Sequence, residues 1–394
     1  MKEVMINDIL DEARDLGCSD LHFTAGLPPM VRLHGRIRKL QGYPDCTEPI
    51  IVNVINQITT LKHKQIIQRG EDADFSYVSA AGHRHRVNVY RQRGYHAIAF
   101  RLLRNDIPTL VDLALPPLLA DFSLRPRGLI LVTGPTGSGK STTLAAMIDH
   151  INRHKNCHII TTEDPIEYLH SHKQSMINQR EINVDVSSFA LALRAALRED
   201  PDVILVGEMR DFETISAAVT AAETGHLVLS TLHTTGAAET LDRIIDTYPP
   251  HAQGQCRSQL ANNVVGIVSQ TLVPTADGNG RVAAMELLNS TDAISSLIRE
   301  GKTFQIPSAI ATGRANGMFT LDQDLARLTA QGRILKEEAL SRCQDPKEFM
   351  RYLEAAHQQV RQGQMGGTMS VKQGPTGARR DMGSALLESE KRKI

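Results

Sequence analysis

One short glycine-rich segment constrains the fold of this chain more than any other feature. It reads Gly134-Pro135-Thr136-Gly137-Ser138-Gly139-Lys140-Ser141 and matches the pattern G-x-x-x-x-G-K-[ST]. An apolar run at 129–133 precedes it, and a segment with apolar residues at helical spacing, 140–154, follows it. In the order strand, loop, helix, backbone N–H groups converge on phosphate oxygens at a positive helix end. The segment therefore predicts a nucleoside triphosphate site in an α/β fold.

The residue types at the end of this loop indicate how a triphosphate is held. Lys140 is expected to place its charge near the β and γ phosphates, and the Ser141 hydroxyl to coordinate Mg²⁺. Thr142 follows directly and is expected to contact the nucleotide as well. ATP and Mg²⁺ are therefore the predicted ligands.

The rest of the chain around this loop alternates short apolar runs with helical patterns. Strands are predicted at 129–133, 158–162, 203–206 and 227–232, and helices at 140–154, 188–197 and 212–224. Strands that are buried on both faces and joined through helices predict a parallel sheet with right-handed crossovers. After Thr235 helical periodicity dominates, apart from a late strand expected at 283–288, and a capped helix is expected at 291–300.

Composition and pattern divide the chain into four regions. Residues 1–104 predict a small α+β domain, with helices at 4–16 and near 50–67 and strands at 30–33, 74–78, 84–90 and 95–102. Four prolines between 105 and 127 indicate a connection without regular structure. Residues 128–357 form the predicted nucleotide-binding domain. Residues 358–394, rich in Gly, Gln and Ser, predict a flexible tail.

Polar side chains follow three of the predicted strands at the edge where α/β sheets bind ligands. Glu163 belongs to the run Glu163-Asp164-Pro165-Ile166-Glu167, Glu208 follows 203–206, and His233 follows 227–232. A carboxylate here can align a water or support Mg²⁺, and a histidine can contact a γ-phosphate. Each also has an ordinary interpretation, as a helix cap, a surface charge or a hydrogen-bonded side chain.

Charge and cysteine content exclude several classes of protein. Lys and Arg number 44 and so do Asp and Glu, so no overall basic field favours nucleic acid or anionic lipid. The apolar runs are too short for a membrane span, and the N-terminal residues lack the features of a signal peptide, so we expect a cytoplasmic protein. Five cysteines without a Cys-x-x-Cys pair predict reduced thiols and no four-thiolate zinc site.

Taken together, these motifs resemble the secretion ATPase superfamily, and within it most closely the PilT-like type IV pilus retraction ATPases. The resemblance covers about residues 5–350. Besides the phosphate loop and the run at 163–167, it rests on the segments 18–22, 197–202, 207–211 and 224–234. The segment 293–300 is similar to a C-terminal helix motif of the retraction branch but departs from it at Ser295 and Ser296.

The resemblance implies a RecA-like ATPase domain with a smaller N-terminal α+β domain of PAS-like type. It also implies roles that spacing alone does not assign. Glu163 would polarise the attacking water, Glu208 would support Mg²⁺ in an atypical Walker B element, and His233 would read the γ-phosphate; His226 belongs to the same motif. The family works as a ring of six, in which arginines of one subunit's N-terminal domain reach the next subunit's nucleotide. Arg86 and Arg101 match those arginines, although neighbouring arginines make a solvated charged surface an alternative.

The expected function is hydrolysis of Mg-ATP by a homohexamer that drives pilus retraction at the inner face of the inner membrane. The expected partner is a membrane platform protein, with a second retraction ATPase as a further candidate. An assembly or secretion motor is the main alternative, but such motors usually carry a paired-cysteine zinc site that this chain lacks. A low-turnover accessory subunit and a nucleic-acid translocase are further alternatives, and the zero net charge disfavours the translocase.

Overall fold

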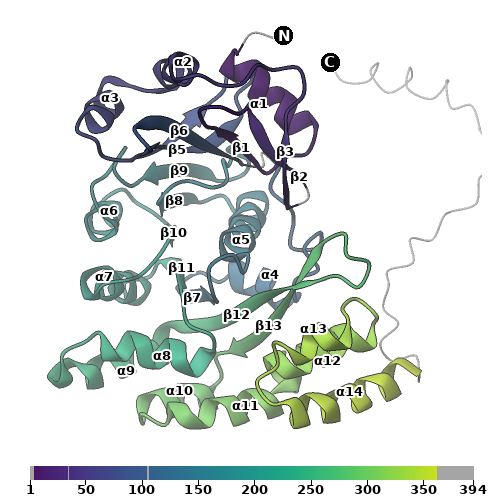
Figure 1. Ribbon diagram of the computed structural model, residues 1–394. Coiled ribbons are helices and arrows are strands. Elements are labelled where there is room, and N and C mark those ends of the chain that lie inside the picture. Colours follow the sequence, from purple (N-terminus) through teal and green to yellow (C-terminus); the bar gives the residue numbers. More distant parts are fainter. Residues whose placement is uncertain (1–3, 34, 104–105, 362–394) are drawn as a thin grey trace, which may run out of the picture.

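The computed structural model describes residues 4–33, 35–103 and 106–361, and these form two stacked units, each built on its own sheet (Figure 1). We call the elements up to β6 the N-terminal domain and the elements from α4 onward the C-terminal domain. The N-terminal domain lies at the top of Figure 1, and the edge strand β9 of the second sheet lies next to it. The fold is thus α/β with a smaller α+β domain, as predicted.

The N-terminal domain is a six-stranded antiparallel sheet in the order β3-β2-β1-β6-β5-β4, covered by three helices. Its strands are β1 (Asp20–Phe23), β2 (Met30–Leu33), β3 (Arg36–Lys39), β4 (Ala73–Val78), β5 (Arg84–Gln92) and β6 (Tyr95–Leu102). Its helices are α1 (Ile6–Asp15), α2 (Glu48–Ile58) and α3 (Leu61–Gln68). The single helical stretch expected near 50–67 is therefore two helices, because Thr59 and Thr60 adopt extended backbone between them.

The second sheet has seven strands in the order β13-β12-β7-β11-β10-β8-β9. They are β7 (Gly128–Thr133), β8 (His158–Glu163), β9 (Met176–Glu181), β10 (Val203–Val206), β11 (Leu227–Leu232), β12 (Val264–Pro274) and β13 (Arg281–Asn289). The four predicted strands β7, β8, β10 and β11 are parallel, as expected. β12 and β13 add an antiparallel hairpin at one edge, which was not expected. β12 also lies where helix was expected. A long strand flanked by helical patterns does not stand out by periodicity alone.

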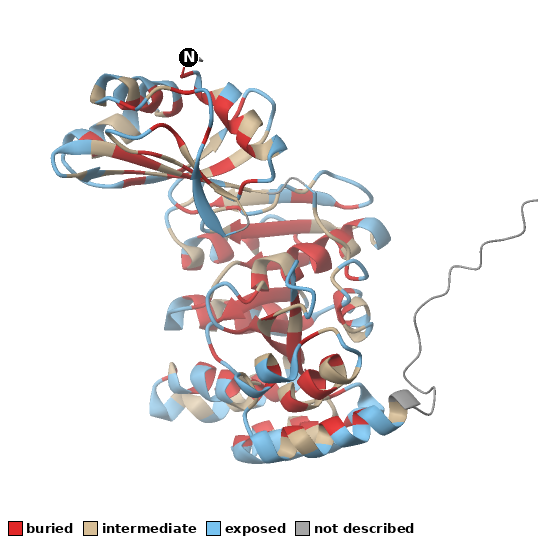
Figure 2. Cartoon of the chain, turned by 45° about the vertical axis from the view of Figure 1, so that its right-hand side comes forward, coloured by how far each residue is buried: buried red, intermediate tan, exposed pale blue. Residues whose placement is uncertain are grey.

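Helices cover both faces of this sheet. The short α4 (Leu118–Ser123) and α5 (Lys140–His154) pack on one face. On the other lie α6 (Phe189–Ala196), α7 (Phe212–Glu223), α8 (Ala237–Asp246) and α9 (Gln253–Asn263). Figure 2 shows the result as a band of buried residues along the central strands. β7 and β11 are buried over their whole length, which is the pattern of strands enclosed from both sides.

The proline-rich connection is more ordered than expected. Residues 118–123 form α4, whose Leu119 and Phe122 are fully buried against Ile130 and Val132 of β7. Gly266 of β12 makes room for the ring, since a Cβ there would lie 2.2 Å from Phe122 Cε2. This part of the expected linker therefore belongs to the core of the C-terminal domain.

Five helices complete the described chain: α10 (Asp292–Arg299), α11 (Ile306–Thr312), α12 (Leu321–Ala330), α13 (Lys336–Leu340) and α14 (Pro346–Arg361). Thr291 caps α10 as predicted, its hydroxyl accepting from the N–H of Ile294 at 3.3 Å. The expected flexible tail begins within α14, and its residues 362–394 lie outside the described part of the chain. Among the described residues, no helix combines the length and apolar character that crossing a membrane requires.

Candidate nucleotide site

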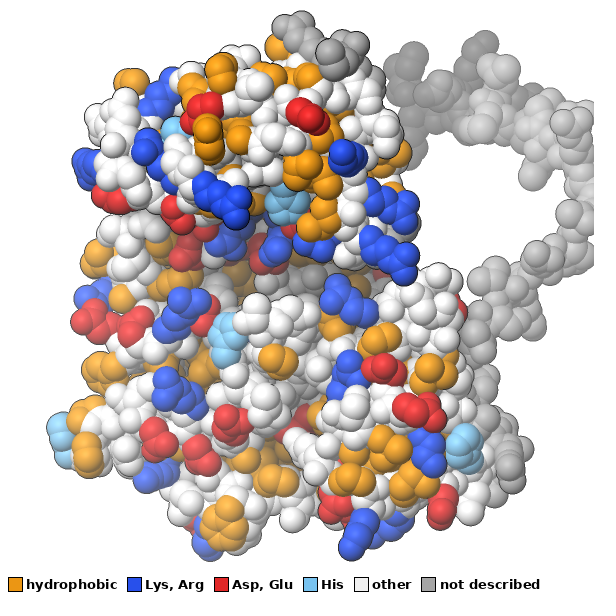
Figure 3. Space-filling model, viewed as in Figure 1, with side chains coloured by type: hydrophobic (Ala, Val, Ile, Leu, Met, Phe, Trp, Pro, Cys, Tyr) orange, Lys and Arg blue, Asp and Glu red, His pale blue; other side chains and the backbone are white. Residues whose placement is uncertain are grey.

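A cleft of about 570 Å³ lies at the junction of the two domains. It brings together eleven of the residues predicted from the sequence: Arg86, Arg101, Thr136, Gly137, Gly139, Lys140, Ser141, Thr142, Glu163, Glu208 and His233. Figure 3 shows Lys and Arg side chains gathered along the lower rim of the N-terminal domain, facing the hollow between the domains. Gly134, Pro135 and Ser138 of the phosphate loop do not line the cleft.

The phosphate loop between β7 and α5 contains backbone conformations that favour glycine. Gly137 and Gly139 have φ values of 80° and 90°, in the left-handed region, and Gly139 is the N-cap of α5. A Cβ at Gly134 would lie 2.2 Å from the carbonyl oxygen of Gln270. The Gln270 side chain of β12 also braces the loop, because its Nε2 donates to the Ser138 carbonyl at 2.6 Å. Gly134 and Ser138, which do not line the cleft, thus hold the loop against β12.

Lys140 folds its side chain back over this loop. Its Nζ donates to the carbonyl oxygens of Gly134 at 2.8 Å and Pro135 at 3.1 Å. Burial lowers the pKa of Lys140, while the nearby carboxylates of Glu208 and Glu167 act in the opposite direction. A buried ammonium held only by carbonyls is well placed to exchange them for phosphate oxygens.

Glu163 is the last residue of β8, and its carboxylate is held by neighbouring donors. Its Oε1 accepts from Thr161 Oγ1 at 2.7 Å and from Gln179 Nε2 at 3.1 Å. Burial raises the pKa of Glu163, and these two hydrogen bonds, with one from the backbone of Glu167, oppose the rise. A carboxylate with a raised pKa is a stronger proton acceptor, as a group that activates water requires.

Glu208 and His233 follow adjacent strands and touch each other. His233 Nε2 lies 3.2 Å from Glu208 Oε1, and Arg210 Nε lies 2.6 Å from the same oxygen. Burial raises the pKa of Glu208, but the hydrogen bond from Arg210 and the nearby positive charges outweigh it, so the net pKa is lowered. Glu208 is therefore an ionised carboxylate at the mouth of the cleft. His226 lies just before the other end of β11 and hydrogen-bonds the Ala221 carbonyl.

Arg86 and Arg101 are direct partners in the register of β5 and β6. Arg86 pairs with Asp74 at 2.7 Å, and Arg101 Nε lies 3.3 Å from Asp20. Both line the cleft of their own chain. In this single chain they therefore lie at the same cleft as the phosphate loop, and their expected reach to the nucleotide of the next subunit stays a prediction.

Two further contacts around the cleft were not predicted from the sequence. Arg84 of β5 forms an ion pair with Glu181 at the end of β9, and both side chains are largely buried. Glu181 also accepts from Ser76 Oγ at 3.1 Å and from the N–H of Ile166 at 3.1 Å. The pair therefore ties the N-terminal domain to the loop that follows Glu163. No local motif marks it, because its partners lie 97 positions apart.

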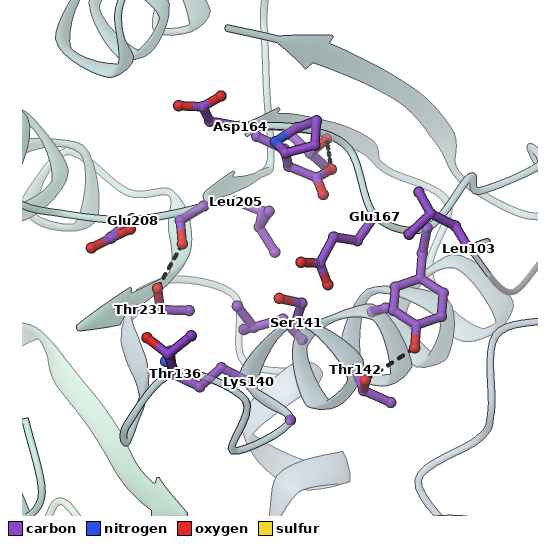
Figure 4. Close-up of a pocket in the computed structure, with 18 of the residues that line it drawn as sticks. Leu103, Thr136, Lys140, Ser141, Thr142, Asp164, Glu167, Leu205, Glu208 and Thr231 are labelled. Atoms are coloured by element: carbon purple, nitrogen blue, oxygen red, sulfur yellow. Dashed lines mark hydrogen bonds between the residues drawn. The ribbon is translucent and has the colours of Figure 1, made fainter. Parts of the chain in front are cut away.

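The second contact links the phosphate-loop helix to the acidic loop. Thr142 Oγ1 and the Tyr168 hydroxyl lie 3.0 Å apart, and a dashed line marks this bond at Thr142 in Figure 4. The same view shows Glu167 extending toward Ser141, with Glu208 on the other side of the cleft. The start of α5 and the ends of β8 and β10 therefore face a common space.

The residues around this space suit a magnesium–triphosphate. Glycine backbone at Gly137 and Gly139, the Lys140 ammonium and the arginines form a cationic cradle, while the Ser141 hydroxyl and the ionised Glu208 supply the oxygen ligands that Mg²⁺ prefers. Fold and cleft together define a phosphate-loop ATPase with a candidate general base, Glu163, beside the loop.

Comparison with known proteins identifies the family. The family model described as "Type II/IV secretion system protein" matches residues 100–372, so the chain belongs to this family. The type IV pilus retraction ATPase PilT of Pseudomonas aeruginosa is 46% identical over 87% of this chain and 99% of its own. The type IV pilus ATPase PilU of the same organism is 40% identical over 82% of this chain and 85% of its own.

A solved structure agrees with the sequence comparisons. The crystal structure of the pilus retraction motor PilT with bound ADP has a TM-score of 0.83 and 49% identity, and covers 89% of this chain and 100% of that one. The chain is accordingly an ATPase of the type II/IV secretion family that is similar to pilus retraction motors over most of its length.

Proposed function

We propose that this protein is a motor ATPase that hydrolyses Mg-ATP to power retraction of type IV pili. The observation that carries the proposal is the cleft itself, because one space holds the phosphate loop and Glu163 of the C-terminal domain and Arg86 and Arg101 of the N-terminal domain. A site built from two domains changes when the domains move. Nucleotide turnover can therefore do mechanical work.

In the proposed reaction, the loop amides and Lys140 bind the phosphates at the N-terminus of α5. Glu163 orients a water and accepts its proton as the water oxygen attacks the γ-phosphorus. The bond between that phosphorus and the β–γ bridging oxygen breaks, releasing ADP and phosphate. His233 contacts the γ-phosphate from the end of β11. When bound by Ser141 and Glu208, Mg²⁺ neutralises charge on the phosphate oxygens.

The arginines are proposed to report the state of the nucleotide to the N-terminal domain. In the structure they pair with Asp74 and Asp20, whose carboxylates hold them within their own domain. Their side chains are 43% and 67% exposed, so they can exchange these partners for phosphate oxygens. Such an exchange pulls the N-terminal domain toward the C-terminal domain and relaxes after hydrolysis.

The proposed working form is a homohexamer at the cytoplasmic face of the inner membrane, docked on a platform protein of the pilus machine. A second retraction ATPase is a further proposed partner. The similarity to both PilT and PilU supports this setting. An accessory retraction subunit with low turnover is the second candidate function, favoured by the PilU similarity, and its turnover separates it from the main proposal.

Deleting the gene and observing the pili tests this function directly. A retraction motor predicts longer and more numerous pili that no longer shorten, and complementation with Glu163→Gln should leave that phenotype in place. Complementation with Asn178→Leu, a change on an exposed position of β9, is the matched control and should restore retraction. Cells without pili after deletion would instead indicate an assembly motor.

A further inference from the structure

The edge strand β9 pairs with β8, which ends at Glu163, and lies next to the N-terminal domain. In the parallel register of β8 and β9, Gln179 lies opposite Thr161. Side chains two positions apart in a strand share a face, so Thr161 and Glu163 extend from the same side of β8. Gln179 joins them there, half-buried, with its amide against the Glu163 carboxylate.

Three hydrogen bonds fix the Gln179 side chain. Its Nε2 donates to Glu163 Oε1 at 3.1 Å and to the carbonyl oxygen of Tyr168 at 2.9 Å. Its Oε1 accepts from the backbone N–H of His170 at 2.8 Å. Because both ends of the amide are engaged, the side chain has a single favourable orientation.

We propose that Gln179 is a positioning residue that aims the Glu163 carboxylate at the attacking water. Gln179 and Thr161 both donate to Oε1, so two side chains fix the plane of the carboxylate from two directions. Gln179 also binds the backbone at Tyr168 and His170, so it holds the side chain and the following loop in one arrangement. This inference rests on the proposed role of Glu163.

The charges around Glu163 explain why such a donor is needed. Burial raises the pKa of Glu163, and Glu167 on the same loop raises it further. Arg84, facing it from β5 of the N-terminal domain, is the nearby positive charge. The bonds from Gln179 and Thr161 favour the ionised form. Without Gln179 the carboxylate is both less well aimed and more readily protonated.

Steady-state ATPase kinetics of the full-length protein test the proposal, with four variants: Gln179→Leu, Gln179→Asn, Glu163→Gln and the double variant Glu163→Gln/Gln179→Leu. Asn178→Leu is the control, since Asn178 is the neighbouring amide on the opposite side of β9 and contacts His158. We expect Gln179→Leu to lower kcat about 10- to 100-fold with KM for ATP within roughly threefold, because misplacing a catalytic group by about 1 Å has effects of this size. In the pH profile of Gln179→Leu, the fall of kcat on the acid side should begin at a higher pH, because the Glu163 carboxylate is more readily protonated.

Gln179→Asn keeps the amide but shortens its reach, so it should lose kcat as well, without a change in the melting temperature. The decisive comparison is the double variant, because Gln179→Leu should not lower kcat further in a protein that already carries Glu163→Gln. An equal fold-loss in both backgrounds, or wild-type kcat for both Gln179 variants, overturns the positioning role while leaving Glu163 as the general base. Wild-type turnover of Glu163→Gln alone overturns the proposed function itself and the inference with it.

Discussion

Removing Arg84 should loosen the contact between the two domains by a predictable amount. In Arg84→Ala the Glu181 carboxylate, only 5% exposed, loses its buried positive partner. Breaking a buried pair from one side costs about 3–5 kcal/mol. The low end applies, because Ser76 and the N–H of Ile166 still donate to Glu181. About 3 kcal/mol corresponds to roughly a hundredfold larger open population.

Native-state hydrogen exchange at the Ile166 amide measures this opening, since that N–H donates to Glu181 Oε2 at 3.1 Å. We expect roughly hundredfold faster exchange in Arg84→Ala, because the Glu181 carboxylate is left buried without its positive partner. Arg194→Ala removes an exposed pair with Glu213 and serves as the control, with an effect of at most about 1 kcal/mol. Unchanged exchange in Arg84→Ala would refute the claim that this pair ties the domains together.

Three further predictions follow from local geometry and burial. Gly134→Ala should weaken binding of a fluorescent ATP analogue at least about tenfold, because the new Cβ would lie 2.2 Å from the Gln270 carbonyl oxygen. Gly254→Ala is the control and should bind the analogue normally, because the space around Gly254 is open. Glu163→Gln should melt at a higher temperature than wild type at pH 7, but not at a pH below about 4. The pKa of Glu163 is raised in the folded state, so its ionisation destabilises the folded protein only above the unfolded-state pKa. Equal melting temperatures at pH 7 would contradict this. Gly266→Ala should lower the free energy of unfolding by about 1–3 kcal/mol through its clash with Phe122, and by less when Phe122 is already Leu. Additive losses in urea titrations would contradict this, because they would show that the two sites are independent.

Much of the C-terminal domain is predictable from local sequence because its signals are local. The run from Lys140 to His154 is predicted as a helix and observed as one, and the strand at 203–206 is matched at both ends. The phosphate loop needs only eight consecutive residues to be recognised. The ends of parallel strands then place Glu163, Glu208 and His233 on one edge, and all three line the cleft.

What the sequence does not reveal depends on contacts between distant residues. The pair of Arg84 and Glu181 and the bond from Gln179 to Glu163 depend on which strands become neighbours, and β9 carries no periodicity that marks it as a strand. The position of Arg86 and Arg101 at the rim of the cleft likewise depends on how the two domains stack. The order of α4 reflects tertiary burial of Phe122, which outweighs the prolines around it.

The central claim is that a triphosphate and the Glu163 carboxylate meet in one cleft for hydrolysis. Single-turnover release of phosphate at saturating ATP, wild type against Glu163→Gln, tests it most directly, with nucleotide binding measured in parallel. We predict near wild-type affinity for both proteins and a rate of phosphate release at least about 100-fold lower in Glu163→Gln. Comparable release by the two proteins would contradict the account, and a loss of binding in Glu163→Gln would mean that Glu163 holds the nucleotide and does not act on water.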